Sequence, residues 1–133
     1  MEPQTNRALI LDLYDARARR DLEHVRRILA DDVAWHDPYP PPHGGDLVGA
    51  DRVIAQIIEA ADRVTGGSTI LHPVDVLVND QRAIAIVDWC TSIGDRHMAG
   101  RELAHYEIRD GRVVEAWFYP QNVAASDAFF TTS

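Results

Sequence analysis

Residues 106–117 of the chain read Tyr-Glu-Ile-Arg-Asp-Gly-Arg-Val-Val-Glu-Ala-Trp. The Asp110-Gly111 pair in the middle is a strong signal for a tight β-hairpin, because both central residues of such a turn adopt a positive φ. The stretch therefore predicts two antiparallel strands, over residues 97–109 and 113–119. Pro120 ends the second strand, because proline has no backbone N–H to donate to a sheet.

The sequence before this hairpin extends it into a meander. Two further strands are predicted over residues 69–78 and 83–93, and Asn79-Asp80 forms the turn between them. A short strand over residues 33–37 lies much earlier in the chain. It is stopped by Pro-rich sequence, which cannot continue a hydrogen-bonded ladder.

The remaining segments predict helices. Apolar residues recur at spacings of three and four over residues 5–20 and again over residues 50–64, so each segment has one apolar stripe. A shorter helix lies between them and begins after Asp21, a favourable N-cap. Helices at the start followed by a run of strands indicate the α+β class. The length of 133 residues predicts a single domain over residues 1–133.

Composition excludes several classes of function. All 13 basic residues are Arg, 21 residues are acidic, and the net charge is −8. Such an acidic surface disfavours nucleic acid and anionic membranes as partners. Without Lys, no side-chain amine is present to form a Schiff base with a carbonyl substrate.

The single cysteine, Cys90, cannot form an internal disulfide, which indicates a reducing compartment. The first residues are polar and carry no signal-peptide pattern. No stretch is long and apolar enough to predict a membrane span. We therefore expect a cytoplasmic protein.

Three segments in order, residues 30–38, 49–53 and 106–117, resemble the SnoaL-like family of the nuclear-transport-factor-2-like superfamily. The resemblance covers about residues 5–130. It implies a cone-shaped, strongly bent antiparallel sheet wrapped around a long helix, with the N-terminal helices closing a pocket. Relatives include ketosteroid isomerase, limonene epoxide hydrolase, polyketide cyclases and non-catalytic binding domains, so the fold alone does not fix the function.

Asp37 is the first candidate catalytic residue. The Asp37-Pro38 pair after a short strand resembles the place where ketosteroid isomerase carries its general base. A carboxylate at the mouth of an apolar pocket becomes more basic as it is desolvated, and can then move a proton on a substrate. The alternative is that Asp37 only caps the turn that follows it.

Tyr14 and Asn122 are the other candidate catalytic residues, as polar groups that orient a substrate. Tyr14 lies on an apolar helical stripe, so it is either a core residue or a hydroxyl in the pocket. Asn122 follows the last strand, where SnoaL-like cyclases carry a catalytic Asp. The resemblance to ketosteroid isomerase is incomplete, since its second acidic group falls at Ala104, which has no proton to donate.

Aromatic residues provide the candidate substrate-binding walls. These are Trp35, Trp89, Tyr106 and Phe118. Trp35 shares its strand face with Asp37, and the resemblance implies that Phe118 also faces the pocket. The alternation of side chains along the strand does not determine which face of the sheet Trp89 occupies. Trp117 and Tyr119 fall on the opposite, outer face, where relatives form dimers.

Together these residues predict a cofactor-independent isomerase, cyclase or hydrolase that acts on a small lipophilic ring compound, such as a polyketide, terpenoid or steroid-like molecule. The alternative is a non-catalytic domain that binds a small ligand or only dimerises. We expect a homodimer, without a cofactor and without a metal. His36 and His43 lie seven positions apart across a Pro-rich stretch, which is not the compact spacing of a metal site.

Overall fold

The computed structural model describes residues 3–39 and 44–131 of the chain. His43 and the prolines at 40–42 therefore lie outside the described residues. The elements in chain order are helix α1 (Pro3–Ala18), helix α2 (Leu22–Ile28), strand β1 (Leu29–Asp37), strand β2 (Gly45–Val48), helix α3 (Ala50–Val53), π-helix η1 (Ile54–Glu59), helix α4 (Ala60–Thr65), strand β3 (Ile70–Val78), strand β4 (Arg82–Ile93), strand β5 (Arg96–Arg109), strand β6 (Arg112–Pro120) and helix α5 (Val123–Thr131). The α+β class is confirmed.

The described strands form one six-stranded sheet in the order β2-β1-β6-β5-β4-β3. Strands β3 to β6 form the expected antiparallel meander. Strand β1, however, runs parallel to β6, so the sheet is not antiparallel throughout. This pairing joins segments that are distant in the chain, such as Trp35 with Ala116, and local sequence patterns carry no signal for it.

Two short elements were not predicted. Strand β2 follows the Pro-rich segment, where the sequence predicted no strand, and it pairs with β1 at the edge of the sheet. Helix α5 follows Pro120, beyond which the sequence predicted no helix or strand. Strand β1 is also longer than expected, because it begins at Leu29, directly after helix α2.

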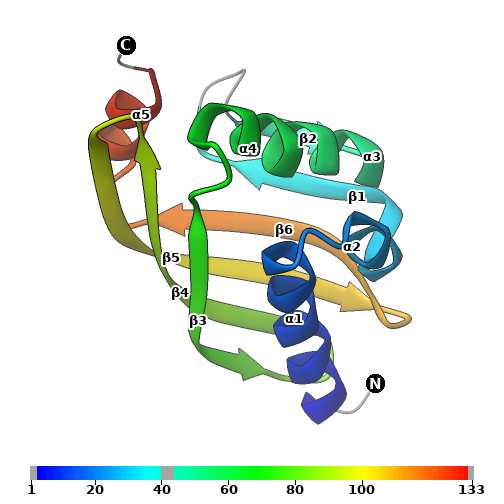
Figure 1. Cartoon of the computed structure of the whole chain (residues 1–133). Coiled ribbons are helices and arrows are strands. Elements are labelled where there is room, and N and C mark those ends of the chain that lie inside the picture. The colour runs from blue at the N-terminus through cyan, green and yellow to red at the C-terminus, as the bar shows by residue number, and fades with distance from the viewer. Residues whose placement is uncertain (1–2, 40–43, 132–133) are drawn as a thin grey trace.

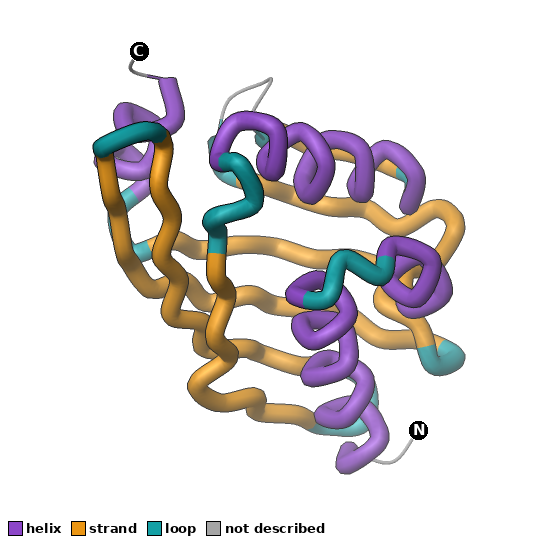
Figure 2. The backbone as a smooth tube through the Cα atoms, viewed as in Figure 1, coloured by secondary structure: helices purple, strands orange, loops and turns teal. Residues whose placement is uncertain are grey.

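The helices α1, α2 and the α3–η1–α4 helix lie on the same side of the curved sheet, as Figure 1 shows. The tube in Figure 2 follows the sheet as it bends around them, with α5 at the end where β6 finishes. Helix α1 contacts β3 and β4, and α4 contacts β4. The concave face of the sheet and the helices therefore enclose the core.

The α3–η1–α4 helix contains six residues, Ile54–Glu59, in π-helical form. Such a bulge inserts extra backbone into a helix and is often found beside a functional site. Ile54 and Ile58 of this segment are buried against the core, whereas Gln56 and Ile57 face the cavity described below.

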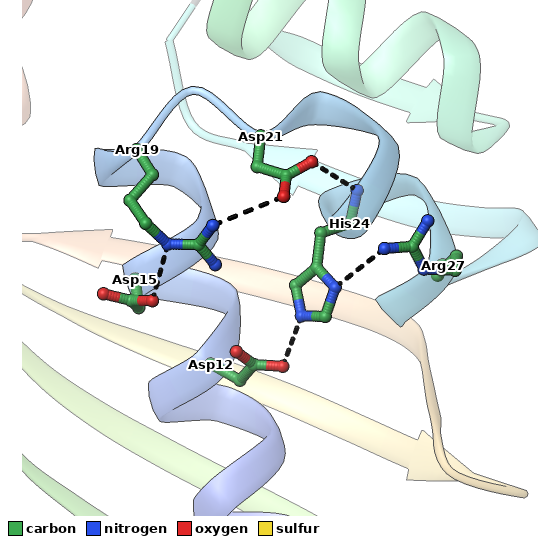
Figure 3. A network of polar contacts seen from close by, with 6 residues as sticks. All are labelled: Asp12, Asp15, Arg19, Asp21, His24 and Arg27. Atoms are coloured by element: carbon green, nitrogen blue, oxygen red, sulfur yellow. Dashed lines mark hydrogen bonds and ion pairs between the residues drawn. The ribbon is translucent and has the colours of Figure 1, made fainter.

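Polar contacts fix the corner between α1 and α2 (Figure 3). Asp21 caps α2 by accepting a hydrogen bond from the backbone N–H of His24 at 3.1 Å. Asp12 on α1 contacts the His24 ring at 2.5 Å, and Arg19 reaches both Asp15 and Asp21. These contacts hold the C-terminal end of α1 in place over the sheet.

The outer face of the sheet carries an apolar strip. Its exposed members are Leu77, Ile84, Leu103 and Tyr119, each 41–57% exposed. Trp117 lies beside the strip, stacked between the rings of His36 and His105. The ion pair Asp88–Arg101 borders the strip on one side and the pair Arg82–Glu107 on the other.

No helix within residues 3–39 and 44–131 combines the length and the apolar character that a membrane crossing requires.

Two tyrosines tie α1 to the sheet. The hydroxyls of Tyr14 and Tyr106 lie 2.6 Å apart and form a buried hydrogen bond. The two rings pack edge to face, with centroids 6.3 Å apart. Tyr106 is completely buried and Tyr14 is 3% exposed, so each hydroxyl depends on the other for its hydrogen bond. Burial raises the pKa of both hydroxyls, so both stay protonated at neutral pH.

We expect Tyr14→Phe and Tyr106→Phe each to lower the free energy of unfolding by about 1–3 kcal/mol, because each leaves one buried hydroxyl without a partner. The double variant removes both hydroxyls, so its loss is expected to be smaller than the sum of the two single losses. Urea denaturation of the four proteins measures this coupling. Strictly additive losses would show that the two hydroxyls do not depend on each other.

Candidate functional site

A cavity of about 260 Å³ lies between the concave face of the sheet and the helices. Most of its wall is apolar or aromatic. The lining residues come from α1, β1 and the segment after it, the α3–η1–α4 helix, four further strand segments and α5: Arg17, Trp35, Asp37, Tyr39, Gln56, Ile57, Ala60, Ala61, Val64, Thr69, Leu71, Trp89, Thr91, Glu102, Phe118 and Phe130. Few polar groups in a mainly apolar cavity are typical of a small-molecule site.

Asp37 lies in the wall of this cavity, at the last position of β1. Its Oδ1 accepts a hydrogen bond from the backbone N–H of Tyr39 at 3.1 Å, so it also caps the turn. Gly44 covers the carboxylate from the other side, since a Cβ at that position would lie 2.5 Å from Asp37 Oδ1. Burial raises the pKa of Asp37 to about 6, although the Tyr39 N–H and the positive charge of Arg17 act in the opposite direction.

Glu102 is a second carboxyl in the same wall, and sequence reasoning missed it. It lies on β5, two residues before Ala104, and therefore on the same strand face. Because side chains alternate between the two faces of a strand, the assignment of Ala104 to the pocket is the signal that places Glu102 there too. The pKa of Glu102 is raised to about 7, mainly by burial; the charge of Arg17 lowers it and the negative charge of Asp37 raises it.

Arg17 is the cation of the site, and sequence reasoning missed it too. It lies one helical turn after Tyr14 on α1, so the two side chains lie on neighbouring parts of one helix face. Its charge lowers the pKa of Asp37, of Glu102 and of Tyr106. The site therefore contains two carboxyls that titrate near neutral pH beside one permanent positive charge.

The aromatic residues divide into those that line the cavity and one that supports it. Trp35, Trp89 and Phe118 line it, and the rings of Trp35 and Phe118 pack at 4.8 Å. Trp89 faces inward and lies across Gly100 on β5, where a Cβ would come within 2.9 Å of the indole. Tyr106 is not part of this lining but lies behind Trp35, with ring centroids 6.3 Å apart.

Tyr14 and Asn122 do not lie in the wall that holds Asp37. Tyr14 lines a separate, adjoining cavity, and its hydroxyl is bonded to Tyr106. Asn122 is exposed and is not among the residues that line either cavity. Its Oδ1 accepts a hydrogen bond from the backbone N–H of Ala125 at 2.9 Å, so it caps α5.

Helix α5 closes one end of the cavity with Phe130. Arg96 anchors the helix, because its guanidinium donates to the Phe129 carbonyl at 2.9 Å and lies over the Phe129 ring. The hydroxyl of Tyr39 is hydrogen-bonded to Ser126, which joins α5 to the turn that holds Asp37. Asn122 thus acts on the site only through the helix that it caps.

Within the described residues, no three His, Cys, Asp or Glu side chains converge in a way that could hold a metal ion. His36 lies on the outer face, between Asp46 at 2.9 Å and Glu115 at 2.7 Å. These two carboxylates raise the pKa of His36.

The family follows from a match over most of the chain. Residues 10–116 match the model of the SnoaL-like domain. The chain belongs to the SnoaL-like family. A comparison of this chain with curated proteins found no match.

Solved structures of similar proteins share the fold of this SnoaL-like chain. Bal32a, from a soil-derived mobile gene cassette, is 23% identical with a TM-score of 0.91, covering 98% of this chain and 99% of that one. An NTF2-like protein of Burkholderia pseudomallei is 24% identical with a TM-score of 0.83, covering 96% and 98%. TerC, co-crystallized with polyporic acid, is 18% identical with a TM-score of 0.82, covering 96% and 99%.

The raised pKa values of Asp37 and Glu102 imply a pH-dependent cost to stability. A carboxyl whose pKa is higher in the folded chain is destabilising once it ionises, so the cost is absent below about pH 4 and complete above about pH 7. We expect Asp37→Asn and Glu102→Gln each to raise the free energy of unfolding at pH 8 by about 3 kcal/mol, since the pKa rises from 3.8 to about 6 for Asp37 and from 4.5 to about 7 for Glu102, and each unit of pKa corresponds to about 1.4 kcal/mol.

At pH 4 the same variants are expected to unfold with nearly the same free energy as the wild type. Asn at position 37 can still accept the hydrogen bond from Tyr39, so the turn is preserved. Glu59→Gln, an exposed change on the π-helix, is the matched control. Denaturant unfolding at both pH values measures the effect, and an equal gain at pH 4 and pH 8 would contradict burial of the ionised carboxyls.

Proposed function

We propose that this protein is a cofactor-independent enzyme that moves protons on a small lipophilic ring compound bound in the cavity. The single observation that carries the proposal is the presence of two carboxyls, Asp37 and Glu102, in one mainly apolar wall with pKa values of about 6 and about 7. Paired acidic groups whose pKa values lie near the working pH are suited to general acid–base catalysis.

The two carboxyls take different roles because their pKa values differ. At neutral pH Asp37 is mainly ionised and acts as the base, removing a proton from a substrate carbon next to a carbonyl group. Glu102 is protonated in about half of the molecules and donates its proton to the carbonyl oxygen as negative charge develops there. Asp37 then returns its proton to a different carbon while Glu102 takes back the proton from the enol oxygen, so the isomerisation ends with both carboxyls in their starting forms. Neither step requires an oxidant or reductant.

The same pair could protonate an epoxide oxygen, or assist a cyclisation in which a carbanion attacks a second carbonyl carbon. The walls formed by Trp35, Trp89 and Phe118 suit the flat face of a polyketide, terpenoid or steroid-like ring. A volume of about 260 Å³ is at the small end of ligand pockets, which supports a substrate with one or two rings in this part of the site. Co-crystallization of TerC with polyporic acid supports a small organic ligand in this fold.

Proton exchange tests this proposal without knowledge of the natural substrate. We expect the protein to accelerate exchange of the α-protons of 2-tetralone with D₂O, followed by NMR at neutral pD. Asp37→Asn is expected to lower the exchange rate by about 10²–10⁴-fold, because it removes the base, and Glu102→Gln to lower it to a similar extent. Glu59→Gln is expected to match the wild type.

Exchange at the same rate in wild type and Asp37→Asn would contradict a base at position 37. Binding of 2-tetralone without any accelerated exchange would instead favour a non-catalytic ligand-binding domain.

The outer apolar strip supports a homodimer. Leu103 and Tyr119 of the strip are paired across β5 and β6, and both are exposed. The flanking pairs Asp88–Arg101 and Arg82–Glu107 give the strip a polar rim with charges of both signs. An apolar centre inside a polar rim is the usual composition of an interface between two copies of one chain.

Size-exclusion chromatography with light scattering is expected to give twice the chain mass of 14.9 kDa. Leu103→Glu places an unpaired charge in the strip and is expected to give the monomer mass, whereas Val123→Glu on exposed α5 is expected to stay dimeric. A wild-type protein that remains at 14.9 kDa at high micromolar concentration would rule out this dimer.

A further inference from the structure

A second cavity adjoins the first one. Its volume is about 240 Å³, and it lies between α1, the helix η1–α4 and the start of β3. The residues that line both cavities are Arg17, Ile57, Ala61, Thr69 and Leu71. Because one group of side chains forms part of both walls, the two cavities meet at these residues, and Arg17 is the charged member of the group.

Arg17 is an uncommon residue for such a position. It is partly buried, and no carboxylate among the described residues lies within ion-pair distance of its guanidinium. The next cation in the second wall, Arg20, differs in this respect, because its Nε and one terminal nitrogen donate to both oxygens of Asp62 at 2.8 and 2.9 Å. A partly buried guanidinium without a carboxylate partner is costly unless a ligand supplies one.

The surroundings compensate the charge of Arg17 only in part. Asp37 and Glu102 influence it through space, yet neither forms an ion pair with it. Since the pKa of Glu102 is about 7, this carboxyl is neutral in about half of the molecules at neutral pH. The remaining wall near Arg17 is contributed by Ile57, Ala61 and Leu71, which carry no charge.

We propose that Arg17 binds the anionic group of a ring-containing organic acid, with the ring in the first cavity and the acidic group at the junction with the second. A guanidinium offers two parallel N–H donors to a carboxylate, which gives such a pair direction as well as attraction. The inference rests on the proposed function because it names the substrate class of the same site, but binding is measured separately from turnover.

Two probe molecules of the same shape distinguish recognition of the charged group from recognition of the ring. Biphenyl-4-carboxylate carries the anion, and biphenyl-4-carboxamide replaces it with a neutral group of nearly equal size. By isothermal titration calorimetry at pH 7, the wild type is expected to bind the acid at least about tenfold more tightly than the amide, the ratio typical of a hydrogen bond to a charged group.

Variants at Arg17 assign this preference to one side chain. Arg17→Gln is expected to abolish the preference for the acid and to leave the affinity for the amide unchanged. Arg17→Lys keeps the charge without the planar fork, so a part of the preference is expected to remain. Arg19→Gln is the matched control, because Arg19 is exposed near the same end of α1 and is paired with Asp15. It removes the same charge outside the cavities.

Equal affinities of the wild type for the two probes, or no measurable binding of the acid, would overturn the inference. An unchanged preference in Arg17→Gln would overturn it as well. The proton-exchange assay decides the proposed function independently, because Glu102→Gln is expected to lose exchange activity but to keep the preference for the acid. If the protein prefers the acid but catalyses no exchange, the result supports the anion site and contradicts the proposed activity.

Discussion

Desolvation of two carboxyl groups beside one guanidinium is the constraint on which the site depends. An ionised carboxylate in an apolar wall loses its hydration, and the resulting rise in pKa places its titration near neutral pH. Arg17 keeps the rise moderate, because its charge favours the ionised forms of both Asp37 and Glu102. Loss of Arg17 would raise the pKa of both groups, whereas exposure to water would lower both.

The fold brings these groups together from distant parts of the chain. Arg17 comes from α1, Asp37 from the end of β1, and Glu102 from the first half of β5. The bend of the sheet turns β5 and β1 toward the helices (Figure 1). The contact of Tyr39 with Ser126 and the packing of Gly44 against Asp37 close the site from the side of α5. Exclusion of water by these segments strengthens every electrostatic interaction inside.

The sequence predicted those features that depend on local patterns. The hairpin at Asp110-Gly111 and the meander follow from turn residues and alternation, and Asp37 follows from its residue type at the end of a short strand. The parallel pairing of β1 with β6 was not predicted, because it depends on contacts between distant segments. Helix α5 lacks a clear apolar stripe, so nothing in its residues marked it. Glu102 was not predicted, because the resemblance marks only Ala104, two residues further along the same strand face.

The protonation of Asp37 and Glu102 is measured most directly by NMR titration of the protein labelled with ¹³C at its side-chain carboxyls, with Asp37→Asn and Glu102→Gln used to assign the signals. We expect two carboxyls that titrate together, with apparent pKa values of about 6 and about 7. Both groups titrating below pH 5 would contradict a pair of buried carboxyls poised for proton transfer at neutral pH.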